Sequence, residues 1–206
     1  TFGTVSTLHY IVQAYTKEGE GVLINTPAYD PFAEAVVNNN RKLCCSSLKL
    51  DNNRYYLDLE DMENQMKYEN IRLLIFCSPQ NPSGRIWTKE ELYQVSELCL
   101  KYNVILVSDE IHRDIIFKDY RFVSLWNAHP EIYKNSIICV SPNKGFNLGG
   151  LKTSYVLIRD VKIRETLLER LKSNSITSPN VFAIPAIVAA YNESEEWLDA
   201  MTSYVE

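Results

Sequence analysis

Val104-Ile105-Leu106-Val107-Ser108-Asp109 is an apolar run that ends in a carboxylate. A second run, Ile71–Cys77, leads into Ser78-Pro79-Gln80-Asn81-Pro82-Ser83-Gly84. A third, Ser136–Val140, leads into Ser141-Pro142-Asn143-Lys144-Gly145. Short, continuous apolar runs bounded by turn residues are typical of strands buried on both faces. The three runs therefore predict three buried strands, each of which delivers a polar side chain to its carboxyl end.

Helical patterns lie between these strands and further ones. Three more strand-like runs are Val22–Asn25, Leu43–Leu50 and Ser154–Ile158. Helical patterns cover Leu8–Tyr15, Asp58–Met66, Thr88–Tyr102 and Val161–Leu171, and Pro179–Glu206 predicts two more helices. Strands that alternate with helices predict an α/β fold, with a mainly parallel central sheet and helices on both faces. Ligands of such sheets bind beyond the carboxyl ends of the strands.

Composition excludes several classes of function. The 206 residues carry a formal net charge of −5, without a basic stripe, so we expect no nucleic-acid partner. No apolar run approaches the roughly 18 residues of a membrane span, so we expect no membrane partner. The three histidines lack metal-ligand spacing, so we predict no metal site. The cysteines lack CxxC spacing and lie mostly in apolar runs, which favours reduced thiols in a cytoplasmic protein.

An amine, a carboxylate and a carboxamide at neighbouring strand ends suit one cofactor, pyridoxal 5'-phosphate (PLP). Lys144 would form a Schiff base with the cofactor aldehyde, and Asp109 would keep the pyridine nitrogen protonated, so that the ring withdraws electrons. Asn81 would bond the phenolic oxygen. Taken alone, a lysine is usually a surface residue, an acid after a strand can cap a helix or bind magnesium, and Asn-Pro-Ser-Gly is a turn. Their order along one chain favours the cofactor.

These segments resemble the large domain of a fold-type I PLP enzyme of the class I/II aminotransferase superfamily, and within it the cystathionine β-lyase (C–S lyase) branch. The resemblance extends from Gly3-Thr4-Val5 to Glu196-Trp197-Leu198. It implies a three-layer α/β/α architecture, a small amino-acid substrate, a homodimer and a cytoplasmic location.

The resemblance also implies roles for individual residues. Lys144, Asp109 and Tyr29 would be catalytic, with Tyr29 of Thr26-Pro27-Ala28-Tyr29-Asp30-Pro31-Phe32 stacked on the pyridine ring. Asn81 would also help to place the substrate carboxylate, with Asn81–Pro82 a candidate for a cis peptide bond. His112 stands where many aminotransferases place a tyrosine that bonds the phenolic oxygen. A structural role remains the alternative for His112, and a core or surface role for Tyr29.

The phosphate group needs donors and positive charge. Gly3-Thr4-Val5 precedes a helical pattern, and a helix N-terminus presents free N–H groups to an anion. Ser141 would add a hydroxyl. Lys152 stands where many aminotransferases carry an arginine, and it supplies charge without the bidentate geometry of a guanidinium. A plain surface position is the alternative for Lys152.

The resembling branch implies α,β-elimination from L-cystathionine or a related cysteine S-conjugate, giving a thiol, pyruvate and ammonia. Three features favour this reaction: His112, the segment Phe146-Asn147-Leu148-Gly149-Gly150-Leu151, and the motif around Tyr29. An aminotransferase is the first alternative, because PLP supports both reactions. A PLP-binding regulatory or interaction protein without required turnover is the second.

The ends of the chain suggest an internal fragment, since Thr1 replaces an initiator methionine and the final helical pattern stops uncapped at Glu206. We predict a PLP-binding large domain over residues 1–192, with its N-terminal part missing. Residues 193–206 would begin the helix that leads to an absent C-terminal domain. The substrate-carboxylate arginine of the family lies in that domain, so we expect the isolated chain to be poorly active.

Overall fold

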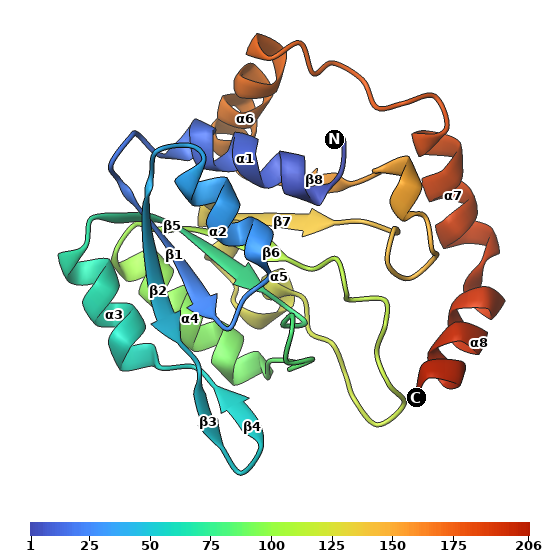
Figure 1. The fold of residues 1–206 in the computed structure, drawn as a ribbon, viewed down its shortest axis with the longest axis horizontal. Coiled ribbons are helices and arrows are strands. Elements are labelled where there is room, and N and C mark those ends of the chain that lie inside the picture. Colours follow the sequence, from blue (N-terminus) through green and yellow to red (C-terminus); the bar gives the residue numbers. More distant parts are fainter.

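The computed structural model describes residues 1–206 (Figure 1). A six-stranded sheet has the order β2-β1-β5-β6-β7-β8. Its strands are β1 (Gly21–Thr26), β2 (Lys42–Ser47), β5 (Ile71–Cys77), β6 (Ile105–Asp109), β7 (Ser136–Val140) and β8 (Tyr155–Leu157). All neighbours are parallel except β7 and β8, which are antiparallel. The predicted mainly parallel sheet is confirmed.

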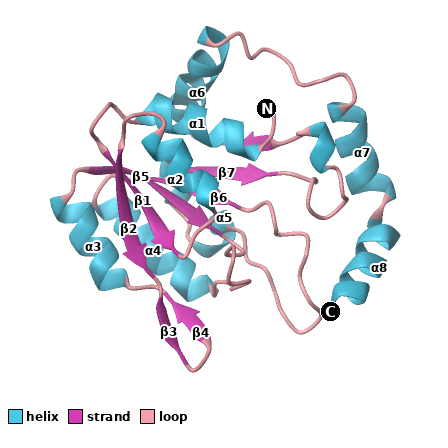
Figure 2. Ribbon diagram, in the orientation of Figure 1, coloured by secondary structure: helices cyan, strands magenta, loops and turns pink.

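Helices cover both faces of the sheet (Figure 2). One face packs against α1 (Thr4–Tyr15), α2 (Asp30–Val37) and α6 (Val161–Ser173), and the other against α3 (Leu59–Tyr68), α4 (Lys89–Lys101) and α5 (Leu125–Ala128). Adjacent residues of β5 point to opposite faces: Leu73 packs in the core under α1, α2 and α6, and Leu74 packs in the core under α3, α4 and α5. This alternation is the two-residue period of a strand, and it makes the domain a three-layer α/β/α structure.

Polar caps define where the helices begin. Thr88 and Glu91 form a reciprocal capping box at α4: Thr88 Oγ1 accepts from Glu91 N over 3.2 Å, and Glu91 accepts from Thr88 N over 2.7 Å. Asp58 caps α3 by accepting a hydrogen bond from Asp61 N, and Asp160 caps α6 by accepting one from Ile163 N. Because these caps satisfy N–H groups that the helix leaves unpaired, the predicted starts agree with the observed ones.

Two local predictions were wrong or incomplete. Leu43–Leu50 is not a single strand, because β2 ends at Ser47 and β3 (Lys49–Asp51) pairs with β4 (Arg54–Tyr56) as a hairpin. Its turn residues Asn52 and Asn53 have φ angles of 47° and 59°, which asparagine tolerates. Helix α2 has no counterpart in the sequence prediction.

The C-terminal stretch forms two helices, as predicted: α7 (Ala183–Glu193) and α8 (Glu195–Val205). No residue of α8 is buried. The two short 3₁₀ helices are η1 (Ile132–Asn135) and η2 (Gly149–Leu151). None of the helices is long and apolar enough to cross a membrane. The division between residues 192 and 193 stays a prediction.

Candidate active site

The carboxyl ends of β5, β6 and β7 lie side by side at one edge of the sheet (Figure 1). Asp109, the last residue of β6, is in register with Cys77 of β5 and Cys139 of β7. Backbone hydrogen bonds continue beyond the strands, from Ser78 N to Asp109 O over 3.0 Å and from Glu110 N to Cys139 O over 2.9 Å. The segments that carry Asn81, His112 and Lys144 therefore leave the sheet at neighbouring points.

Asp109 is buried without a fixed cationic partner. It is 1% exposed, and its carboxylate accepts one hydrogen bond, from Ile111 N over 3.3 Å. Burial is the main cause that raises the pKa of Asp109 to about 7, while the Ile111 N–H and the Lys144 ammonium oppose the rise. A buried carboxylate is costly unless a donor or cation meets it. The site therefore fits a ligand that presents a protonated ring nitrogen to Asp109.

The thiols on both sides of Asp109 add no charge. Cys77 and Cys139 are both buried, and burial raises the pKa of each thiol above its usual value. The Asp109 carboxylate raises both further, because a second negative charge would be repelled. Asp109 thus lies between two neutral thiols, so a bound ligand could supply the positive charge that pairs with its carboxylate. The five cysteines are all unpaired, and only Cys45 is exposed.

Lys144 lies close enough to act on two other predicted residues. Burial lowers the pKa of His112, and the Lys144 ammonium lowers it further. The same ammonium also lowers the pKa of Asp109. The Lys144 side chain itself is exposed. Lys144 stands four residues beyond the end of β7, in a loop rather than on the strand.

The C-terminal helices hold the Lys144 loop. Gly145 accepts a hydrogen bond through its carbonyl from Trp197 Nε1 over 3.3 Å. A Cβ atom at Gly145 would lie 3.3 Å from Leu198 Cδ1, so the helix and the loop are in close contact. Phe146 packs edge-to-face on Tyr191, with 5.5 Å between ring centroids. The position of Lys144 depends on α7 and α8 as well as on β7.

The predicted phosphate residues converge on one place. Gly3, the N-cap of α1, has φ 90° and leaves the helix without a side-chain cap. A Cβ atom at Gly3 would lie 3.6 Å from Lys152 Cβ, so the helix start and Lys152 are neighbours. Ser141 Oγ donates to Thr153 O over 2.5 Å, so the loop after β7 also lies close to the residue that follows Lys152. Uncapped N–H groups at Thr4 and Val5, with a lysine and a hydroxyl nearby, fit a phosphate.

Asn81 and Tyr29 lie on the side of the site toward β1 and β5. Asn81 is half-buried, begins a turn and precedes a cis bond to Pro82, as expected from the sequence. Tyr29 precedes α2, is 36% exposed and packs edge-to-face on Phe32 at 5.9 Å. Gln80 connects the two segments: its Nε2 donates to Pro27 O over 2.6 Å and to Asn81 O over 3.0 Å. Sequence reasoning missed Gln80, although a buried amide is a usual way to fix a turn.

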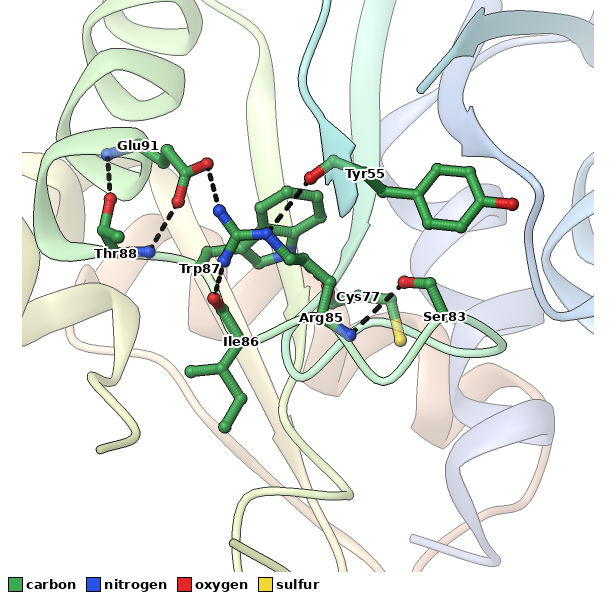
Figure 3. Close-up of polar contacts among 8 residues, drawn as sticks. All are labelled: Tyr55, Cys77, Ser83, Arg85, Ile86, Trp87, Thr88 and Glu91. Carbon is green, nitrogen blue, oxygen red and sulfur yellow. Dashed lines mark hydrogen bonds and ion pairs between the residues drawn. The ribbon is translucent and has the colours of Figure 1, made fainter. Parts of the chain in front are cut away.

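A second missed group, Arg85, fixes the Asn81 turn from its far end (Figure 3). The guanidinium donates to Tyr55 O over 3.1 Å and to Glu91 Oε1 over 2.6 Å, and it lies 5.0 Å from the Trp87 ring centroid. Trp87 Nε1 in turn donates to Cys77 O over 2.9 Å. The turn is thereby connected to β4, to the α4 capping box and to the end of β5.

Glu110 is the third missed residue. Its side chain is fully buried, and its carboxylate accepts from Leu125 N over 2.9 Å and from Ser124 Oγ over 2.9 Å. Burial raises the pKa of Glu110, and these bonds lower it. Glu110 joins the strand end to the start of α5, and so it closes the loop that carries His112.

A buried acid, an amine on the adjacent loop and an anion cup at the carboxyl edge of a parallel sheet define an α/β protein that binds a phosphorylated cofactor. The family model described as aminotransferase class I and II matches residues 1–206, and the chain belongs to this family. This confirms the resemblance identified from the sequence.

Named relatives narrow the comparison. The chain is 36% identical over 204 residues to cystathionine beta-lyase PatB of Bacillus subtilis, covering 99% of this chain and 53% of PatB. It is 32% identical to protein MalY of Escherichia coli, covering 95% of this chain and 50% of MalY. The structure of PLP-containing cystalysin from Treponema denticola matches with a TM-score of 0.96 at 33% identity, covering 98% of this chain and 52% of cystalysin. The chain thus spans about half the length of these relatives.

Proposed function

We propose that this chain forms the cofactor-binding part of a PLP-dependent C–S β-lyase. The substrate would be L-cystathionine or a related cysteine S-conjugate. The observation that carries the proposal is Asp109, a buried carboxylate without a cationic partner, next to the Lys144 loop. The 36% identity to cystathionine beta-lyase PatB supports a lyase within the wider family.

The overall reaction takes one water and no oxidant. A cysteine S-conjugate and water give a thiol, pyruvate and ammonium: the bond from the β-carbon to sulfur breaks, both electrons stay with sulfur, and sulfur takes a proton. Bound PLP withdraws electrons from the substrate α-carbon, which makes the α-proton acidic. The protein has to hold that ring, move the α-proton and place the substrate.

The residues of the site divide these tasks. Lys144 would hold the cofactor through its amine, and the same amine would take the α-proton of the substrate. Asp109 would face the ring nitrogen and keep a proton there, a role that suits a buried carboxyl without a cationic partner. Asn81 and His112 line the cleft at this edge, and they would hydrogen-bond the phenolic oxygen and the substrate carboxylate. Tyr29 would stack on the ring.

A separate group of residues would hold the phosphate. The N–H groups at Gly3, Thr4 and Val5, the Ser141 hydroxyl and the Lys152 ammonium would form the cup for the phosphate. Residues that fix the phosphate would orient the ring toward Lys144 and Asp109.

The proposal includes the setting of the protein. We assign a homodimer, as the family resemblance implies, and a small amino-acid substrate. The five unpaired thiols support a reducing, cytoplasmic compartment. The isolated chain would hold PLP but turn over poorly, and appreciable turnover by residues 1–206 alone would contradict that part.

Pyruvate release from L-cystathionine, with no keto acid present, tests the reaction in the full-length protein that carries this chain. We expect sustained release that Lys144→Ala abolishes and that Lys172→Ala, at an exposed position on α6, leaves unchanged. Release that survives Lys144→Ala would contradict the assigned role of the lysine.

An aminotransferase is the second candidate, because the family model carries that description. In the same assay it would release no pyruvate from L-cystathionine, and amino transfer would start when a keto acid is added. Retained PLP with neither reaction would favour a regulatory or interaction protein.

A further inference from the structure

A cleft of about 800 Å³ connects the candidate active site to three charged surface side chains. Asn81 and His112 line it, together with the turn that follows Asn81. Its remaining walls come from the β3–β4 hairpin and from the loop after β6, which contribute Arg54, Asp119 and Arg121. A cleft of this size accommodates an amino acid with an extended substituent.

The three arginines of the cleft differ in their surroundings. Arg85 has a side chain that is 9% exposed and forms an ion pair with Glu91 over 2.6 Å, so its charge is already used within the fold. Arg54 and Arg121 are exposed, and neither side chain forms an ion pair or donates a hydrogen bond. The Arg54 guanidinium carbon lies 5.8 Å from the centroid of the Tyr56 ring. Two guanidinium groups therefore face the cleft region without a partner in this chain.

The charge of the outer wall suits one anionic group. Asp119 is the only acidic residue among those that line the cleft, so two unpaired arginines leave one positive charge in excess. The protein as a whole has the opposite sign, with a formal net charge of −5. A guanidinium binds a carboxylate through two parallel N–H donors, which a lysine or an amide cannot match.

We infer that Arg121, assisted by Arg54, recognises a carboxylate on the leaving thiol of the substrate. The protein then prefers cysteine S-conjugates whose sulfur substituent ends in a carboxylate over conjugates with a neutral end. This inference rests on the proposed function, because it takes the reacting carbon–sulfur bond to lie near Lys144 and His112. Arg121 acts as a specificity residue and does not touch the reacting atoms.

Two substrates of the same shape test this inference: S-(2-carboxyethyl)-L-cysteine and its amide, S-(2-carbamoylethyl)-L-cysteine. We expect the full-length protein with PLP to show a kcat/KM for pyruvate release at least about tenfold higher with the carboxylate. Arg121→Gln removes that preference by raising KM for the carboxylate substrate alone, with kcat unchanged. Arg54→Gln reduces the preference less, and Arg170→Gln on the exposed face of α6 leaves it intact.

Binding separates this inference from the proposed function. On a Lys144→Ala background, calorimetric titration with each conjugate gives dissociation constants without any turnover. Tighter binding of the carboxylate that disappears when Arg121→Gln is added supports the inference, even if neither conjugate yields pyruvate and the lyase proposal fails. Equal binding of the two conjugates overturns it, and so does an equal loss of both when Arg121 is replaced.

Discussion

Two tryptophans donate their indole N–H to a backbone carbonyl beside the site, in contrasting surroundings. Trp87 is 1% exposed and donates to Cys77 O over 2.9 Å, at the end of β5. Trp197 is 52% exposed and donates to Gly145 O over 3.3 Å, next to Lys144. The first bond lies within the core, whereas the second comes from a helix without a buried residue.

The contrast shows that the two sides of the site are built differently. Asp109 and the Asn81 turn are fixed by strands, by Gln80 and by the Arg85 contacts, all at or near the core. Lys144 is fixed by a loop that α7 and α8 hold from the surface. A hydrogen bond that competes with water contributes little, so the lysine side is held less firmly than the acid side.

The largest effect is expected on the acid side, at Asp109. Its pKa of about 7 lies above the usual 3.8, so the folded chain without cofactor favours the protonated carboxyl up to about pH 7. The stabilising contribution is complete below about pH 3.8 and is lost as the pH rises through about 7. Asp109→Asn removes this dependence, and above pH 8 it raises the free energy of unfolding by roughly 2–4 kcal/mol relative to the parent chain.

Urea unfolding of both chains at a series of pH values measures this difference. Asp199→Asn, at an exposed position on α8, is the matched control and should follow the parent curve. If Asp109→Asn also tracks the parent between pH 4 and 8, then the carboxyl is not held in the environment described here.

The next effect compares the two tryptophans directly. Trp87→Phe leaves the Cys77 carbonyl without its donor in the core and removes packed volume, so it should cost about 1–3 kcal/mol in the free energy of unfolding. Trp197→Phe removes a half-exposed hydrogen bond and should cost less than about 1 kcal/mol. Denaturation of both variants at pH 7 gives the two values, and equal costs would show that the two sides are held alike.

The groups that follow the buried strands, on both sides of the site, were predictable because their signals are local. Each buried strand is a continuous apolar run, and the polar residue that follows it marks the carboxyl end. Asp109, Asn81 and Lys144 could therefore be assigned to one edge of the sheet from sequence alone. The capping residues Asp58 and Thr88 marked helix starts for the same reason.

The remaining features depend on contacts between distant segments. Gly145 and Trp197 are separated by 52 residues, and nothing in either segment indicates the other. Lys144 is exposed because it lies in the loop after β7 and not on the buried strand itself. Asn52 and Asn53 did carry a hairpin signal, but the apolar residues of Leu43–Leu50 concealed the break at Leu48.

Adding PLP to the chain of residues 1–206 tests the central claim most directly. We predict a yellow absorbance band, which forms when a protein amine bonds the PLP aldehyde. The band should disappear in Lys144→Ala, and it should persist in Lys152→Ala with weaker PLP affinity, because Lys152 would contact only the phosphate. A band of undiminished intensity in Lys144→Ala would contradict the account, because the bonded amine would then lie elsewhere in the chain.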